Sequence, residues 1–143
     1  MSNFKIQSLT MKKYIKTIGI LALCIFGISS CKKAGTDGDA TLVVFAKHHG
    51  VIITNKNTYP DSVYVKFNAK DAPSDPTHDY DAVFVGEVGE DHIHCTNLHA
   101  GTYYLFVTGM DSTITQRVYG GASVKIKYKE RKGEIDTDIA VTE

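Results

Sequence analysis

Residues 98–107 read Leu-His-Ala-Gly-Thr-Tyr-Tyr-Leu-Phe-Val, in which a turn glycine leads into a run of aromatic and branched side chains. Similar short runs, bounded by Gly, Pro and Asp, recur from residue 41 onward without helical periodicity. This pattern predicts an all-β fold, namely a single antiparallel β-sandwich of about seven or eight strands. The expected strands are residues 41–47, 51–54, 62–68, 82–88, 92–97, 102–109, 123–129 and 135–141.

The alternation of apolar and polar residues predicts which side of each strand faces the core. In residues 123–129, Val124, Ile126 and Tyr128 alternate with three lysines, which is typical of a strand with one wet side. The Gly-Gly pair at positions 120 and 121 is interpreted as a turn before this strand.

Residues 98–107 also contain the spacing Leu-x-x-Gly-x-Tyr, from Leu98 to Tyr103, which resembles a tyrosine corner. In that motif the ring packs in the core and the hydroxyl group bonds to the backbone a few residues upstream. We therefore expect Tyr103 to have this structural role.

The same segment, preceded by Val63-Tyr64-Val65-Lys66, is similar to the Ig-like, transthyretin-like, carboxypeptidase-regulatory-like and CnaB-like β-sandwich modules of bacterial surface proteins. The resemblance covers residues 41–128 and implies a sandwich fold. It implies no single function, because these modules serve as spacers, accessory modules and binding domains.

The first 31 residues have the composition of an export signal. A positive stretch at residues 12–16 precedes an apolar run at residues 18–28. This run is about 11 residues long, whereas a permanent membrane span needs about 20, which favours a signal peptide over residues 1–30. The sequence Ile28-Ser29-Ser30-Cys31 resembles the lipobox of small bacterial lipoproteins of the Bacteroidetes type. The resemblance implies cleavage before Cys31 and a diacylglycerol group on its sulfur.

Three alternatives stay open at this end of the chain. Cys31 could be an incidental thiol, the apolar run could be retained as an anchor, and translation could begin at Met11 rather than Met1. The lipobox interpretation places the protein in the bacterial cell envelope, anchored by lipid to a membrane, with the outer membrane favoured and the domain periplasmic or surface-exposed.

Composition sets the domain boundaries and excludes one class of partner. Residues 31–39 are expected to be the lipidated cysteine and a flexible tether, and residues 40–143 the sandwich domain. Removal of residues 1–30 leaves 12 basic against 16 acidic residues, a net charge of about −4. Such a domain gives no electrostatic reason to expect nucleic acid binding. Cys95 is then the one free thiol, so a packed core must stabilise the fold.

All six histidines follow Cys31, and they suggest a zinc or copper site as an alternative to a domain without a cofactor. His92 and His94 share a face if they lie in a strand, and His99 is the first choice for a third ligand. His48 and His49 are further choices, although adjacent residues of an extended strand point to opposite faces. Because His-x-His alone is a weak signal, the favoured interpretation has no metal.

The remaining residues give little reason to expect an enzyme. There is no nucleophile elbow, phosphate-binding glycine loop or HExxH motif, and Cys95 is expected to be a small buried hydrophobic residue. The acidic residues of the 70–81 region are interpreted as a solvated loop rather than a calcium site. They are Asp71, Asp75, Asp79 and Asp81.

Three outward tyrosines are the remaining candidates for a binding surface. Tyr64, Tyr104 and Tyr119 suggest a platform for a protein or glycan partner. The sequence thus favours a membrane-anchored envelope lipoprotein whose sandwich is a binding or structural module. A histidine-based zinc or copper lipoprotein, or a subunit of a larger envelope complex, are the alternatives.

Overall fold

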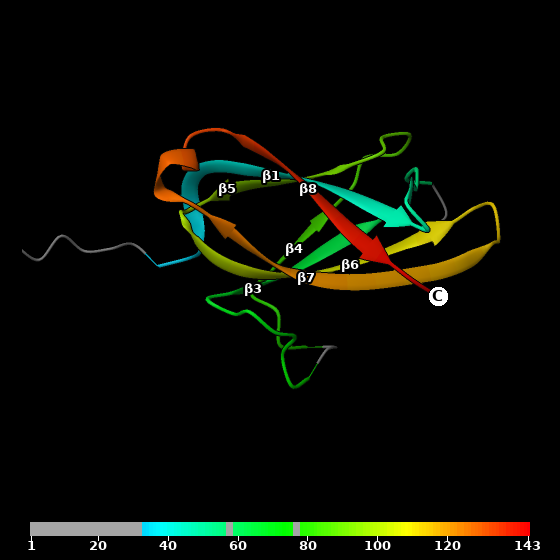
Figure 1. The fold of residues 1–143 in the computed structure, drawn as a ribbon, viewed down its shortest axis with the longest axis horizontal. Coiled ribbons are helices and arrows are strands. Elements are labelled where there is room, and N and C mark those ends of the chain that lie inside the picture. The colour runs from blue at the N-terminus through cyan, green and yellow to red at the C-terminus, as the bar shows by residue number, and fades with distance from the viewer. Residues whose placement is uncertain (1–32, 57–58, 76–77) are drawn as a thin grey trace, which may run out of the picture. The chain divides into compact units, whose positions relative to one another are not determined.

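A computed structural model describes residues 33–56, 59–75 and 78–143 of the chain. The expected signal peptide and Cys31 lie outside the described residues. In the described part the all-β prediction is confirmed, because eight strands form two four-stranded sheets that lie one above the other (Figure 1). The strands are β1 (Thr36–His48), β2 (Val51–Ile52), β3 (Ser62–Phe67), β4 (Ala82–Val85), β5 (Ile93–Leu98), β6 (Gly101–Asp111), β7 (Gln116–Ile126) and β8 (Glu134–Val141).

The first sheet is built around β1, which pairs with β5 and β2 antiparallel and with β8 in parallel. The second sheet has the order β4-β3-β6-β7 and is antiparallel throughout. The other strand pairs of the two described sheets are antiparallel, as predicted, and the parallel β1–β8 pair is the departure from that prediction. The chain runs through both sheets before its last strand joins β1, and this long connection permits a parallel pairing that a hairpin cannot make.

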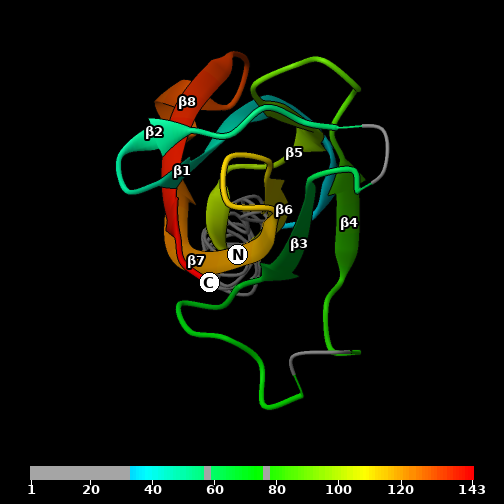
Figure 2. The same ribbon diagram turned by 90° about the vertical axis from the view of Figure 1, so that its right-hand side faces the viewer.

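The core lies between the two sheets (Figure 2) and is filled by the inward side chains of both. Tyr103 is the largest side chain that is completely buried. The other side chains under 2% exposed include Leu42, Leu98, Leu105 and Ile126. The alternation of buried and partly exposed residues along β6 follows the period of two expected for a strand with one covered face.

The Gly-Gly pair was expected to be a turn, but Gly120 and Gly121 lie inside β7. Their role is close packing. A Cβ atom on Gly120 would lie 2.0 Å from the carbonyl oxygen of Ala140, and one on Gly121 would lie 2.3 Å from the hydroxyl group of Tyr104. The missing side chains therefore allow β8 and Tyr104 to approach β7 closely.

β7 ends at Ile126, three residues before the expected strand end. Residues Tyr128–Glu130 form a short 3-10 helix, η1, and the side chain of Tyr128 is 73% exposed instead of facing the core with Val124 and Ile126. Among the residues that the structure describes, no helix is long and apolar enough to cross a membrane.

The domain begins earlier than residue 40. Ala34 is buried, the Gly35 amide donates to the Tyr103 hydroxyl group at 3.1 Å, and β1 starts at Thr36. The expected flexible tether over residues 31–39 is therefore wrong for residues 34–39. A polar, glycine-containing sequence became a strand here because β5 and Tyr103 supply partners for its backbone.

Candidate metal centre

A two-residue turn joins β1 to β2 and places two histidines side by side. His48 pairs with Val51, and the turn residues His49 and Gly50 have φ angles of +49° and +81°. Positive φ at both positions is the geometry of a type I′ hairpin turn, for which glycine at the second position is well suited. The left-handed conformation turns the ring of His49 beside that of His48, with ring centroids 4.2 Å apart. The two side chains do not diverge as they would in an extended strand.

His48 is almost fully buried, at 4% exposure, between two carboxylates. Its Nδ1 lies 2.8 Å from Oδ2 of Asp111 at the end of β6, and its Nε2 lies 2.8 Å from Oε2 of Glu143. A neutral imidazole carries one N–H, so two such bonds require the protonated ring. Hydrogen bonds to Asp111 first, and then to Glu143, accordingly raise the pKa of His48.

The two carboxylates are held in their charged forms. The pKa of Asp111 falls to about 2, chiefly because its Oδ1 accepts a bond from the Thr113 hydroxyl group at 2.6 Å, and further because of His48. The pKa of Glu143 is lowered by its own backbone amide and by His48. The result is one buried imidazole hydrogen-bonded between two carboxylates at the end of the sandwich.

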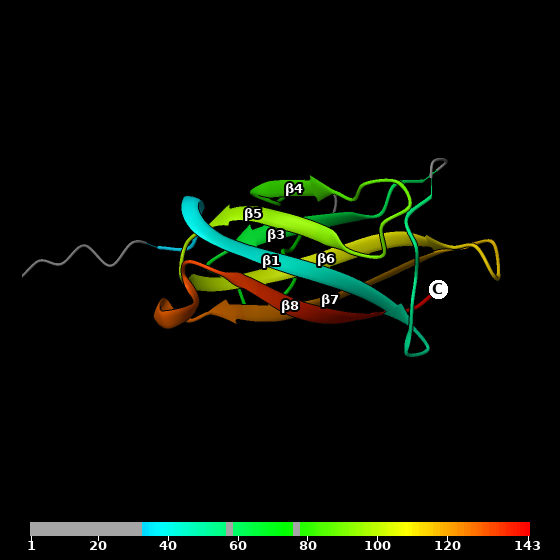
Figure 3. The same cartoon turned by 90° about the horizontal axis from the view of Figure 1, so that it is seen from above.

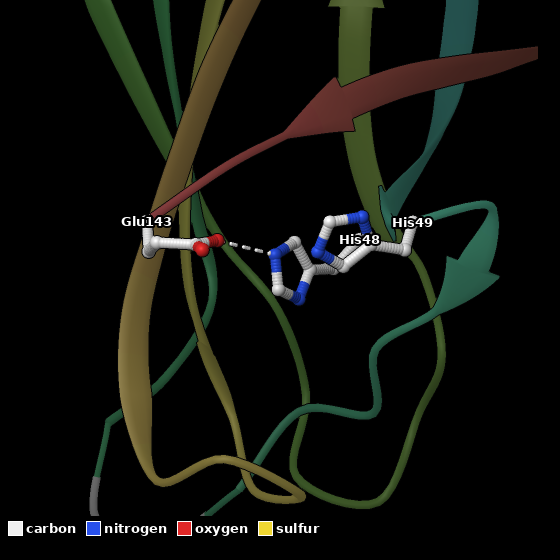
Figure 4. A group of neighbouring side chains, drawn as sticks. All are labelled: His48, His49 and Glu143. Carbon is white, nitrogen blue, oxygen red and sulfur yellow. Dashed lines mark hydrogen bonds and ion pairs between the residues drawn. The ribbon is translucent and has the colours of Figure 1, made fainter.

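This arrangement also matches the donor set of a transition-metal site (Figure 4). One ligand atom from each of His48, His49 and Glu143 lies within 4.8 Å of the other two. Zinc bonds of about 2.0–2.2 Å in a tetrahedral site place ligand atoms roughly 3.4 Å apart, so the separations would need to contract by at most about 1.4 Å. Glu143 and His49 can supply this contraction, because the Glu143 side chain is 56% exposed and His49 is exposed.

Asp111 would then orient His48 from behind. A metal-bound histidine usually donates its other ring N–H to a carboxylate, and the Asp111 contact to Nδ1 has that geometry. The site opens into a cavity of about 520 Å³ formed by the β1–β2 turn, the turn after β6 and the last residues of the chain. A small ligand or water would have room to reach an open coordination position there.

The histidines chosen from the sequence are only partly brought together. Nε2 of His92 lies 3.0 Å from Nε2 of His94, and Nδ1 of His92 lies 2.7 Å from Asp91. His99 is not near this pair, because its amide bonds to the Gly35 carbonyl group at the start of β1 while His94 pairs with Val43. The expected His92, His94 and His99 triad therefore does not form, since His99 lies five positions after His94 and beyond the end of β5.

Cys95 is fully buried in the core, and burial raises the pKa of its thiol to about 12. A thiol of this kind is a poor nucleophile at neutral pH. In the acidic loop, Lys66 contacts Asp79 at 2.8 Å and Asp81 at 3.4 Å. These two carboxylates are thus engaged with a lysine.

The outward aromatic residues gather on the exposed face of the second sheet. Phe106 lies between Tyr64 and Tyr119, with ring centroids 6.3 Å and 6.2 Å away. A hollow of about 320 Å³ lies beside these three rings and includes Arg117. Tyr104 lies further along β6, against Gly121.

Compared with known proteins, the chain matches no family model, no curated protein and no solved structure.

Sequence reasoning missed Asp111 and Glu143, which lie 63 and 95 residues from His48 along the chain. Neither stands in a recognisable motif. The available signal was His-His-Gly between two apolar runs, which is compatible with a tight turn that places both rings at one end of the fold.

Proposed function

We propose that this protein is a lipid-anchored protein of the bacterial envelope whose β-sandwich binds zinc or copper(II) through His48, His49 and Glu143. The observation that carries the metal proposal is the convergence of these three ligand atoms within 4.8 Å, with Asp111 behind His48. Two imidazoles and one carboxylate form a ligand set that zinc sites commonly use.

A metal ion and a proton would compete for the same place. At acidic pH the Nε2 proton of His48 bridges to Glu143, and binding of a cation requires that proton to leave. The elevated pKa of His48 means that metal affinity should rise as the pH increases through that pKa. Asp111 would still accept the Nδ1 proton in both states.

The proposal of a lipid anchor is supported by the sequence before the domain. The lipobox-like Ile28-Ser29-Ser30-Cys31 ends three residues before Ala34, the first buried residue that the structure describes. Mass spectrometry of the mature amino terminus should find a diacylglycerol group on Cys31 and should find none in a Cys31→Ala variant. A wild-type mature amino terminus without lipid would contradict the anchor.

The metal proposal is tested by calorimetric titration of zinc and copper(II) into the mature protein. His49→Ala and Glu143→Gln should each weaken binding strongly, and neither removes a side chain from the core. The double variant His92→Ala/His94→Ala is the matched control, since it removes two imidazoles at another place on the first sheet.

If His49→Ala and Glu143→Gln still bind the metal but the His92→Ala/His94→Ala control does not, the metal is bound by His92 and His94 instead. An absence of binding in the wild-type protein at neutral and mildly alkaline pH would refute metal binding altogether. Circular dichroism of each variant separates a lost ligand from a lost fold.

A further inference from the structure

We propose that the basic segment 125–133 docks on anionic lipid headgroups, so that this end of the sandwich rests on the membrane that carries the anchor. The inference depends on the proposed lipid at Cys31 and adds an orientation to it.

The sandwich holds the chain from Ala34 onward. Ala34 is buried, its amide lies 3.3 Å from the side-chain oxygen of Asn68, and Gly35 is bonded to Tyr103. Two residues lie between Cys31 and Ala34, and the three extended steps from one to the other reach at most about 10 Å. The end of the domain that contains Ala34 would therefore lie close to the lipid headgroups.

The basic segment is at that same end. Ala34 packs closely against Gly101, because a Cβ atom added to Gly101 would lie 2.6 Å from the Cβ of Ala34. Gly101 pairs with Ile126, the last residue of β7, and η1 follows directly. The segment then returns to β1, where the Gly133 carbonyl accepts the Thr41 amide. Figure 3 shows η1 and the start of β1 at one end of the domain.

The charge of this segment is opposite to that of the domain as a whole. Residues 125–133 contain five basic residues and one acidic residue, whereas the sequence after residue 30 is acidic overall. The acidic residue, Glu130, lies 3.8 Å from Lys127. Within the described part of the chain, no carboxylate lies within 4.0 Å of the ammonium groups of Lys125, Lys129 or Lys132. These lysines are exposed and available to phosphate groups.

An aromatic residue stands among these charges. Tyr128 is 73% exposed, and the guanidinium group of Arg131 lies 4.0 Å from the centre of its ring. An exposed tyrosine flanked by basic residues is typical of a surface at the membrane–water boundary, where the ring and the hydroxyl group meet different environments. The sequence count of net charge concealed this surface because acidic residues elsewhere outweigh it.

The orientation has a consequence for the metal site. β1 starts at the anchored end and ends at His48, and beyond the bulge at its start the stretch from Ala40 to His48 spans roughly 26 Å at about 3.3 Å per residue. His48, His49 and Glu143 would then face away from the membrane. Metal ions and soluble partners could reach them without crossing the headgroup layer.

The chain contains no tryptophan, so Tyr128→Trp supplies a single fluorescent reporter. The lipidated protein carrying this change would be reconstituted on vesicles of phosphatidylcholine alone and of phosphatidylcholine mixed with phosphatidylglycerol. We expect a blue-shifted emission that brominated lipids quench on the mixed vesicles and that salt reverses. Tyr119→Trp, on the outer face of the second sheet, should show the same emission on both kinds of vesicle.

Charge variants complete the test. Lys129→Glu/Lys132→Glu should abolish the blue shift, whereas Lys56→Glu/Arg117→Glu, an equal change of charge at exposed positions away from the anchored end, should leave it intact. Equal emission on neutral and anionic vesicles, or an equal effect of both charge variants, would overturn the docking proposal. A protein that stays off both vesicles after purification with its natural amino terminus would instead show that the anchor is absent.

Discussion

The hydrogen bonds of the Tyr103 hydroxyl group link the start of the domain to its core, and removal of that group should lower the free energy of unfolding. Tyr103→Phe keeps the buried ring, which packs edge-on against Phe67 at a centroid distance of 5.8 Å. It deletes the bond that the hydroxyl donates to the His99 carbonyl at 2.7 Å and the bond that it accepts from the Gly35 amide at 3.1 Å. The effect should therefore come from these polar contacts alone.

The expected loss is about 2 kcal/mol of unfolding free energy, because each hydrogen bond of this kind contributes about 1 kcal/mol net. For a domain of this size, that corresponds to a fall in Tm of roughly 8 °C. Urea and thermal unfolding followed by circular dichroism would measure both quantities. The amide of Gly35 should also exchange its hydrogen faster, since it loses its acceptor.

Tyr104→Phe is the matched control, because it removes the hydroxyl group of the next residue, which is only partly buried on the outer face of the same strand. Its effect should stay under about 0.5 kcal/mol, as for most surface substitutions. Equal losses of unfolding free energy in the two variants, or a Tyr103→Phe protein as stable as wild type, would show that the Gly35–Tyr103 hydrogen bond does not stabilise the domain.

Three further predictions concern the metal site, a buried acid and the packing of β8. Asp111→Asn should weaken zinc binding about 10- to 100-fold by calorimetry, because it loosens the group that orients His48, and an unchanged affinity would exclude that role. Burial raises the pKa of Asp61 to about 6, so the folded state retains a proton that the unfolded state loses near pH 4. The free energy of unfolding should therefore fall as the pH rises from about 4 to about 6. Asp61→Asn should remove this fall in urea titrations, and a persistent slope would assign it to another group. Gly120→Ala should cost about 2–3 kcal/mol, since its Cβ would collide with the carbonyl oxygen of Ala140, and a variant of normal Tm would contradict the packing of β7 against β8.

Strand positions were predictable where one face is covered and the other is wet. The alternation in β3 and β6 identified their inward residues, and the burial of Val63, Val65 and Tyr103 follows it. Prediction was wrong where local chemistry and tertiary contacts disagree. Gly120 and Gly121 have turn chemistry, but the requirement for close packing against Ala140 and Tyr104 keeps them in a strand.

The candidate site was also predictable only where local pattern decides, and not where tertiary contacts do. The sequence favoured a domain without a metal, and its alternative metal site began with His92 and His94, whose Nε2 atoms lie 3.0 Å apart. It could not add Asp111 or Glu143 to His48, because contacts across 63 and 95 residues depend on how three segments meet at one end of the sandwich. Local spacing carries no information about such meetings.

The sequence by itself determined the all-β class and the inward faces of the strands, because side-chain alternation is a local consequence of backbone geometry. Only the tertiary structure decided that β8 runs parallel to β1, that residues 34–39 belong to the domain, and that His48 lies between two distant carboxylates. Those outcomes depend on which strands become neighbours, and that choice is made by the packing of the whole core.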